Sequence, residues 1–93
     1  MTSTETELEL ILARLALCES HEQEADLGRS ELASWLFHAR SPLFDDVLRR
    51  TRRDNRLRRC LSAARYYSGL SDEKCRKIDA VLQRPFPAAD RRR

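Results

Sequence analysis

Apolar and polar residues recur along this chain with the spacing of amphipathic α-helices, in four stretches separated by turn signals. Thr4 and Glu7 form the pattern of a capping box, which favours a helix start at this point. Ser41 followed by Pro42 favours another start, because serine caps helices and proline suits the first helical turn. The pattern predicts helices over about 5–22, 29–39, 42–68 and 71–84.

These helices predict an all-α fold, a compact four-helix bundle-like domain over residues 1–84. The polar residues 22–28 are expected to connect the first two helices. Residues 85–93 combine prolines with a terminal run of arginines, so we expect a disordered basic tail there.

The helix predicted over 42–68 is the longest, and its apolar face is interrupted. Two polar residues, Arg50 and Asp54, fall on the face that otherwise carries leucine and valine. Their position predicts a kink or a break near Thr51–Asp54, where Asp54 is a suitable cap for a second helical piece.

The first predicted helix is apolar around most of its circumference. Between Leu8 and Cys18 only Glu9 and Arg14 are polar. A helix of this kind is buried between neighbours or lies in an interface between chains. In so small a protein we expect the second arrangement, a homodimer.

Composition supports the helical interpretation and limits the function. The chain has 14 Leu and 10 Ala but only 2 Val, 2 Ile and 2 Gly, which leaves little from which to build a sheet. Ninety-three residues form one domain without room for a deep catalytic cleft. The sequence also lacks a Gly-rich phosphate loop and a nucleophile–His–acid pattern. We therefore expect no enzyme, no catalytic residue and no cofactor.

Charge is segregated along the chain. Residues 1–39 carry eight acidic and two basic side chains, whereas residues 40–65 carry nine arginines and three aspartates. At 100° per residue, five arginines of the third predicted helix share one face, which we call the arginine stripe: Arg49, Arg52, Arg53, Arg56 and Arg59. Guanidinium groups suit carboxylates and phosphates, so the stripe is a candidate binding surface.

Part of this positive charge has acidic partners nearby in sequence. Acidic residues four positions before three of the arginines favour helix-surface pairs. Arg52, Arg53, Arg56 and Arg59 have no such local partner. These four are therefore the candidates for contact with another molecule.

Three aromatic residues form a second candidate surface. Trp35 and Phe37 lie on adjacent faces of one predicted helix, and Phe44 follows on the next. A bundle this small has limited room to bury all three, so we expect an apolar patch that anchors a partner. We predict a small non-enzymatic binding protein that regulates or chaperones a protein with an acidic surface, through this patch and the arginine stripe.

Two alternatives stay open. In the first, the same arginines contact the phosphates of DNA or RNA, and residues 29–48 partly fit a helix-turn-helix, although Phe37 stands where glycine is usual. In the second, the protein is a structural subunit whose arginines pair with acidic residues of a neighbouring chain. Salt dependence separates these alternatives, because binding to phosphates weakens steeply as salt rises.

Three cysteines, Cys18, Cys60 and Cys75, are widely spaced, and the acidic start of the chain is unlike a secretory signal. We expect a cytoplasmic protein with reduced thiols and no contact with membranes. Cys18 and His21 have the spacing of a zinc-ligand pair. Because the cysteines sit at apolar helical positions, we expect them to pack as small hydrophobic residues and to bind no metal.

Overall fold

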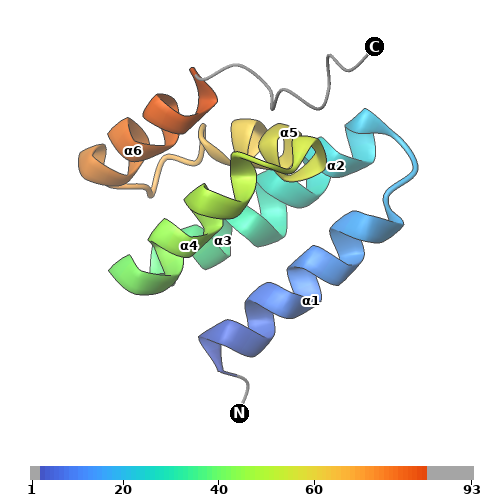
Figure 1. Ribbon diagram of the computed structural model, residues 1–93, viewed down its shortest axis with the longest axis horizontal. Coiled ribbons are helices and arrows are strands. Elements are labelled where there is room, and N and C mark those ends of the chain that lie inside the picture. The colour runs from blue at the N-terminus through green and yellow to red at the C-terminus, as the bar shows by residue number, and fades with distance from the viewer. Residues whose placement is uncertain (1–2, 84–93) are drawn as a thin grey trace.

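A computed structural model describes residues 3–83, which form five helices and no strand (Figure 1). The all-helical prediction is confirmed for this part of the chain. Segments α2, η1 and α3 run without interruption from 21 to 38 and make one helix, in which η1 has π-helical hydrogen bonding. The elements are α1 (Thr4–Leu17), α2 (His21–Leu27), η1 (Gly28–Leu32), α3 (Ala33–His38), α4 (Ser41–Thr51), α5 (Asn55–Ala64) and α6 (Asp72–Leu82).

The first two helices differ from their predicted bounds. Helix α1 is capped by Ser3 and ends at Leu17, well before residue 22. Residues 22–28, predicted as a connector, are helical because the hydroxyl of Ser20 accepts a hydrogen bond from the backbone N–H of Gln23. In return, the Gln23 side chain accepts from the N–H of Glu19 at 2.6 Å. This reciprocal cap starts a new helix and excludes a continuous first helix.

The helix predicted over 42–68, with a kink or a break near Thr51–Asp54, is broken at that position: α4 ends at Thr51 and α5 begins at Asn55. One continuous kinked helix is therefore not observed, and the second piece ends at Ala64, before residue 68. The Asp54 carboxylate accepts a hydrogen bond from the N–H of Leu57 at 3.1 Å and caps α5. The last predicted helix is close to the observed α6, and the predicted tail at 85–93 lies outside the described residues.

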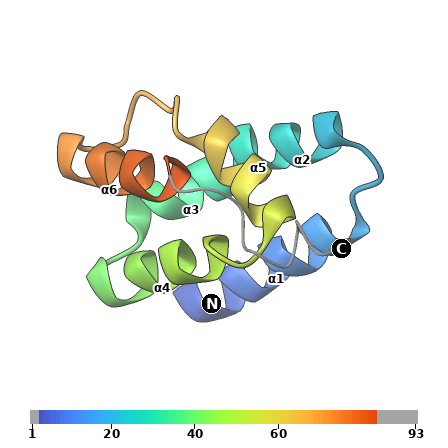
Figure 2. The ribbon, with the colours of Figure 1, turned by 45° about the horizontal axis from the view of Figure 1, so that its top comes forward.

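Helix α5 is the centre of the fold. It packs against each of the other four helices, with the longest contact along α2 and η1. Figure 1 shows α5 over the long helix, with α1 along one edge and α6 along the other, and Figure 2 shows α1 and α4 beside each other below them. A central helix surrounded by the others replaces the expected four-helix bundle.

The long helix approaches α5 closely at Gly28. A Cβ atom on Gly28 would lie 2.0 Å from the carbonyl oxygen of Cys60, which is far inside van der Waals contact. Glycine is therefore required here by backbone proximity rather than by a turn, since no described residue has a positive φ. The large aliphatic side chains that are fully buried belong to one core cluster: Leu32, Leu36, Val47, Leu57, Leu61 and Ile78.

Candidate binding surface

The structure divides the arginine stripe into two groups with different roles. Arg56 donates from Nη1 to the backbone oxygens of Leu15 and Ala16, at 3.0 and 2.8 Å, and so binds the last turn of α1. Arg59 donates from Nε to the carboxylate of Glu24 at 2.6 Å. These two arginines lack a partner nearby in sequence, and their partners are distant residues of the same chain. They hold α1 and α2 against α5.

Glu24 is the acidic residue that these arginines share. Its side chain is only 4% exposed, and Arg56 Nε lies 3.7 Å from the same carboxylate. The hydrogen bond from Arg59 lowers the pKa of Glu24 below its ordinary value, and burial opposes this effect. The same hydrogen bond raises the pKa of Arg59. Both groups are therefore charged at neutral pH and form an internal ion pair.

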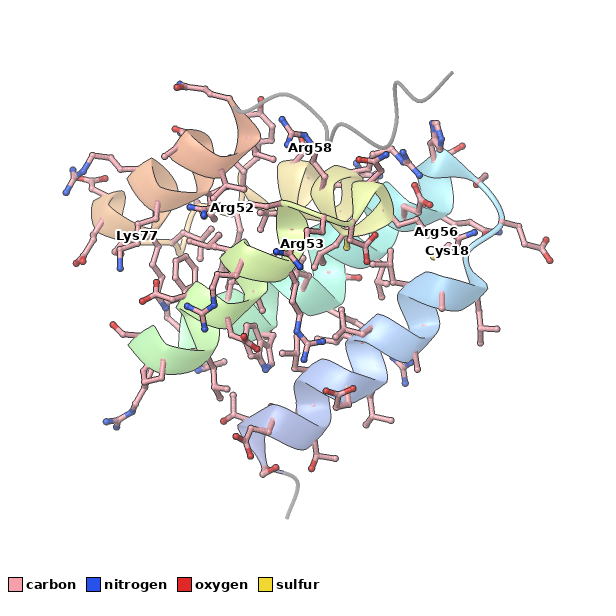
Figure 3. All side chains as sticks on the ribbon, viewed as in Figure 1. Cys18, Arg52, Arg53, Arg56, Arg58 and Lys77 are labelled. Carbon is pink, nitrogen blue, oxygen red and sulfur yellow. The ribbon has the colours of Figure 1, made fainter. Side chains whose placement is uncertain are left out.

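The other group of arginines surrounds the turn between α4 and α5. The side chains of Arg52 and Arg53 are exposed and make no hydrogen bond or ion pair with the described part of the chain. Arg49 has one contact, 3.3 Å from the carboxylate of Asp46, and its side chain is well exposed. In Figure 3 Arg53 and Arg56 lie on the side of α1, whereas Arg52 lies toward α6. The break between the two helices thus removes the single face on which the five arginines were expected.

A groove of about 910 Å³ runs between α1 and the turn that joins α4 to α5. One wall is apolar and comes from α1, with Leu12, Ala13 and Ala16 as its exposed or half-exposed members. The opposite wall carries Arg50, Arg53 and Arg56. Two acidic residues, Glu9 and Asp54, also line it. We call this feature the arginine-rimmed groove.

The groove continues into a smaller hollow on the surface of α4. This hollow, of about 400 Å³, is lined by four arginines: Arg49, Arg50, Arg52 and Arg53. Arg50 and Arg53 line both features, so the apolar wall and the arginine cluster form one continuous surface. Such a surface offers apolar contact and positive charge side by side.

The predicted apolar patch of Trp35, Phe37 and Phe44 does not exist as a surface. Trp35 is 4% exposed and Phe44 is 2% exposed, because both face the core. The indole Nε1 of Trp35 donates to the backbone oxygen of Thr4 at 2.9 Å and fixes the start of α1. Phe37 alone of the three is exposed, at 46%. It packs edge-to-face on Tyr67 and does not line the arginine-rimmed groove.

Sequence reasoning missed the role of Lys74. Its Nζ donates to the backbone oxygens of Leu36, Phe37 and Ala39, and so caps the C-terminus of α3 from α6. Partial burial lowers the pKa of this lysine. An isolated lysine in the sequence gives no sign of this contact, because its three acceptors lie far away along the chain.

Sequence reasoning also missed the apolar wall of the groove on α1. The sequence did contain a signal for this wall, because the first helix is apolar on several faces. Once one face is buried, apolar side chains on the others remain exposed. The residues that α1 buries are Leu8, Ile11 and Leu15. Leu12, Ala13 and Ala16 remain for the groove.

Between residues 3 and 83, no three His, Cys, Asp or Glu side chains are grouped so as to hold a metal ion. Cys60 is buried, and desolvation raises its pKa to about 12. None of the helices in that range is long and apolar enough to cross a membrane. The surface that stands out is the arginine-rimmed groove and its neighbouring hollow.

Fold and groove together define an all-helical domain with an open, apolar and basic surface groove. Comparison with known proteins found no matching family model, no similar curated protein and no similar solved structure.

Proposed function

We propose that the chain is a small non-enzymatic binding protein that regulates or chaperones another protein by holding an acidic, amphipathic helix of it. The observation that carries this proposal is the arginine-rimmed groove, which sets the apolar wall of α1 opposite Arg50 and Arg53. A helix with one apolar face and an acidic flank matches both walls at once. The groove takes the place of the aromatic patch expected from the sequence.

The charges of the groove favour an incoming carboxylate. Arg53 has no partner within residues 3–83. Arg50 lies 3.8 Å from Glu9 and 3.5 Å from Asp46; Arg50 and Glu9 are exposed and Asp46 is partly exposed. Exposed pairs at such distances contribute little, on the order of 0–1 kcal/mol, so Arg50 can exchange them for a partner at small cost. Arg56, in contrast, donates to backbone oxygens of α1 and is a fixed part of the groove lining.

The shape of the groove favours a helix. It is open to solvent along α1, and its volume of about 910 Å³ is at the upper end of ordinary ligand clefts. An elongated apolar wall built by one helix is the surface onto which a second helix packs, with side chains three and four positions apart in contact. The partner helix then directs its acidic side chains toward Arg53 and the adjoining hollow.

Binding to DNA or RNA is the second candidate, and one observation favours it. The smaller hollow is lined by four arginines, of which Arg52 and Arg53 are unpaired within residues 3–83. Fewer arginines are free than the sequence indicated, because Arg56 and Arg59 are engaged inside the fold. The turn between α3 and α4 spans only residues 39 and 40, shorter than the turn of a helix-turn-helix. An acidic protein partner is therefore our first proposal.

We assign the protein to the cytoplasm as part of the same proposal. Its three cysteines are free, and Cys60 is enclosed in the core. Thiols stay reduced in the cytoplasm, which preserves the packing around this residue.

The proposal is tested by fluorescence polarisation with four labelled probes. These are a Leu- and Glu-rich amphipathic helical peptide, a scrambled peptide of the same composition, random duplex DNA and single-stranded RNA. We expect the amphipathic peptide to bind the full chain more tightly than the scrambled peptide does. Arg53→Glu should weaken this binding at least tenfold, because an attractive charge becomes a repulsive one. Arg76→Glu is the matched control, since Arg76 is exposed on α6 outside the groove.

A second variant tests the apolar wall. Ala16→Lys adds positive charge but places a polar side chain on that wall. It should therefore weaken binding of the amphipathic peptide, even though the added charge attracts acidic residues. Equal binding of the two peptides, or no effect of Arg53→Glu, would contradict the proposal. Binding of DNA and RNA with a steep log-linear salt dependence, in the absence of peptide binding, would replace it with the nucleic-acid function.

A further inference from the structure

Helix α1 carries a second apolar stripe, which faces outward and shares Ala13 alone with the arginine-rimmed groove. Leu10 is 53% exposed and Leu17 is 78% exposed, although both lie on a described, regular helix. Thr6, Leu10, Ala13 and Leu17 are spaced four, three and four residues apart and are all exposed. This is the spacing of the contact seam in a coiled coil. We call these four residues the outer stripe of α1.

The outer stripe is bordered by hollows that suit leucine side chains. A hollow of about 470 Å³ beside Leu10 is lined also by Ile11 and Trp35. Another, of about 400 Å³, lies beside Leu17 and is lined also by Leu27. An opposing helix that presents leucines at the same spacing can place one in each hollow, as knobs pack into holes.

Charge makes this surface complementary to itself. Glu7 and Arg14 border the stripe on the same side, each one residue beyond a stripe position. When two copies of α1 pack antiparallel, with Leu10 opposite Ala13 and Thr6 opposite Leu17, Glu7 of each copy lies near Arg14 of the other. Antiparallel packing also sets the positive N-terminal end of each helix dipole beside the negative C-terminal end of the other, so the two dipoles attract.

We propose that the outer stripe of α1 binds a second copy of this chain in an antiparallel, two-fold symmetric dimer. The two-fold axis makes every contact occur twice. The two copies therefore present the same stripe to each other and form two equivalent ion pairs between Glu7 and Arg14. A helix of 14 residues is only about 21 Å long, which makes the interface small. We therefore expect weak association, in the micromolar range or weaker. The proposal does not rest on the proposed function, although Ala13 also lines the arginine-rimmed groove.

Sedimentation of the full chain under reducing conditions, from micromolar to millimolar concentration, tests the dimer. We expect the mass to rise from 10.9 kDa toward twice that value as concentration increases. Leu10→Glu and Leu17→Glu should each weaken association at least tenfold, and circular dichroism should show unchanged helicity because both residues are exposed. Tyr66→Glu is the control, since Tyr66 is an equally exposed apolar side chain away from the stripe. A monomer at every concentration, or unchanged association of the leucine variants, would overturn the proposal.

Charge reversal tests the orientation. Glu7→Arg and Arg14→Glu should each weaken the dimer, and the double variant should restore it, because the reversed pairs attract again. Arg14 also pairs with Glu31 of its own chain, so Glu31→Gln measures how much of the Arg14→Glu effect comes from that contact. A double variant no stronger than the two single variants would contradict the antiparallel arrangement.

Discussion

Arg59 and Glu24 join the central helix to the long helix of this protein through two hydrogen bonds, from Nε at 2.6 Å and from Nη2 at 3.3 Å. The carboxylate is enclosed, whereas the guanidinium is a third exposed. The pair therefore has one end in the core and one end at the surface. Because Arg56 also approaches Glu24, a single carboxylate organises both α5 arginines of the predicted stripe.

We predict that Glu24→Gln lowers the free energy of unfolding by about 1–3 kcal/mol, because Arg59 then loses its charged acceptor. Urea unfolding at neutral pH measures this change. Glu22→Gln, an exposed position on the same helix, is the control and should have little effect. Equal effects of the two substitutions would contradict the structural role of Glu24.

The same pair predicts how stability depends on acid. The pKa of Glu24 is lowered in the folded protein from its ordinary value of 4.5. As pH falls below that value, the unfolded chain takes up the proton first, so the stabilisation by this pair is lost as pH falls through the folded pKa. Above the ordinary value it is fully present. Urea unfolding between pH 7 and pH 2 should show a smaller loss in Glu24→Gln than in the parent protein, and parallel curves would rule the pair out as a cause.

Gly28→Ala should destabilise the protein strongly, by about 2 kcal/mol or more, although alanine is the better helix former. The added Cβ meets the backbone of α5 at Cys60, which moves only if the two helices separate. Thermal unfolding measures the effect. Gly69→Ala is the comparison, because its Cβ meets mainly the Tyr67 side chain, which can rotate away. A stabilised Gly28→Ala variant would show that the helices are not in close contact.

Lys74→Met should cost about 1–3 kcal/mol, because three backbone oxygens at the end of α3 lose their donor. Methionine keeps most of the apolar stem against Phe44, above whose ring the ammonium lies at 5.4 Å. Lys77→Met is the control, since Lys77 makes only surface ion pairs with Asp45 and Glu73. Guanidinium unfolding should therefore separate the two lysines, and equal losses would contradict the capping role.

The three thiols should differ in reactivity toward a disulfide reagent at pH 8. Cys60 is buried and its pKa is about 12, so it stays protonated and unreactive while the protein is folded. Cys18 and Cys75 are partly exposed and should react first. Reaction of Cys60 should appear as a slow phase, and this phase should be absent in Cys60→Ala. Rapid reaction of all three thiols in the folded protein would show that the core around α5 is open.

The sequence was a good guide to which residues are helical and a poorer one to where helices begin and end. Asp54 was recognised as a potential cap, and α5 does begin there. The cap at Ser20 was missed, although Ser20 and Gln23 have the spacing of a capping box. The apolar run before it obscured this signal. Residues 22–28 were interpreted as a connector because they are polar, whereas Glu24 and Gly28 within them pack against α5.

The candidate site was predictable in its charge but not in its geometry. The concentration of arginines between residues 49 and 59 is evident from the sequence. Which of them are free depends on distant residues: Arg59 meets Glu24, and Arg56 meets the end of α1 some forty residues earlier. Trp35 and Phe44 were misplaced for a similar reason, since α1 and α6 supply the cover that two neighbouring helices alone lack.

Helix α1 is fastened near both ends, by the indole of Trp35 at Thr4 and by the guanidinium of Arg56 at Leu15 and Ala16. A helix held in this way does not fray from one end while the other stays in place. Its amide hydrogens should therefore exchange with deuterium in one cooperative opening, at a common free energy below that of global unfolding. If the contact of Trp35 or that of Arg56 is removed, the amide hydrogens of α1 should no longer exchange together. Those nearest the released end should then exchange first.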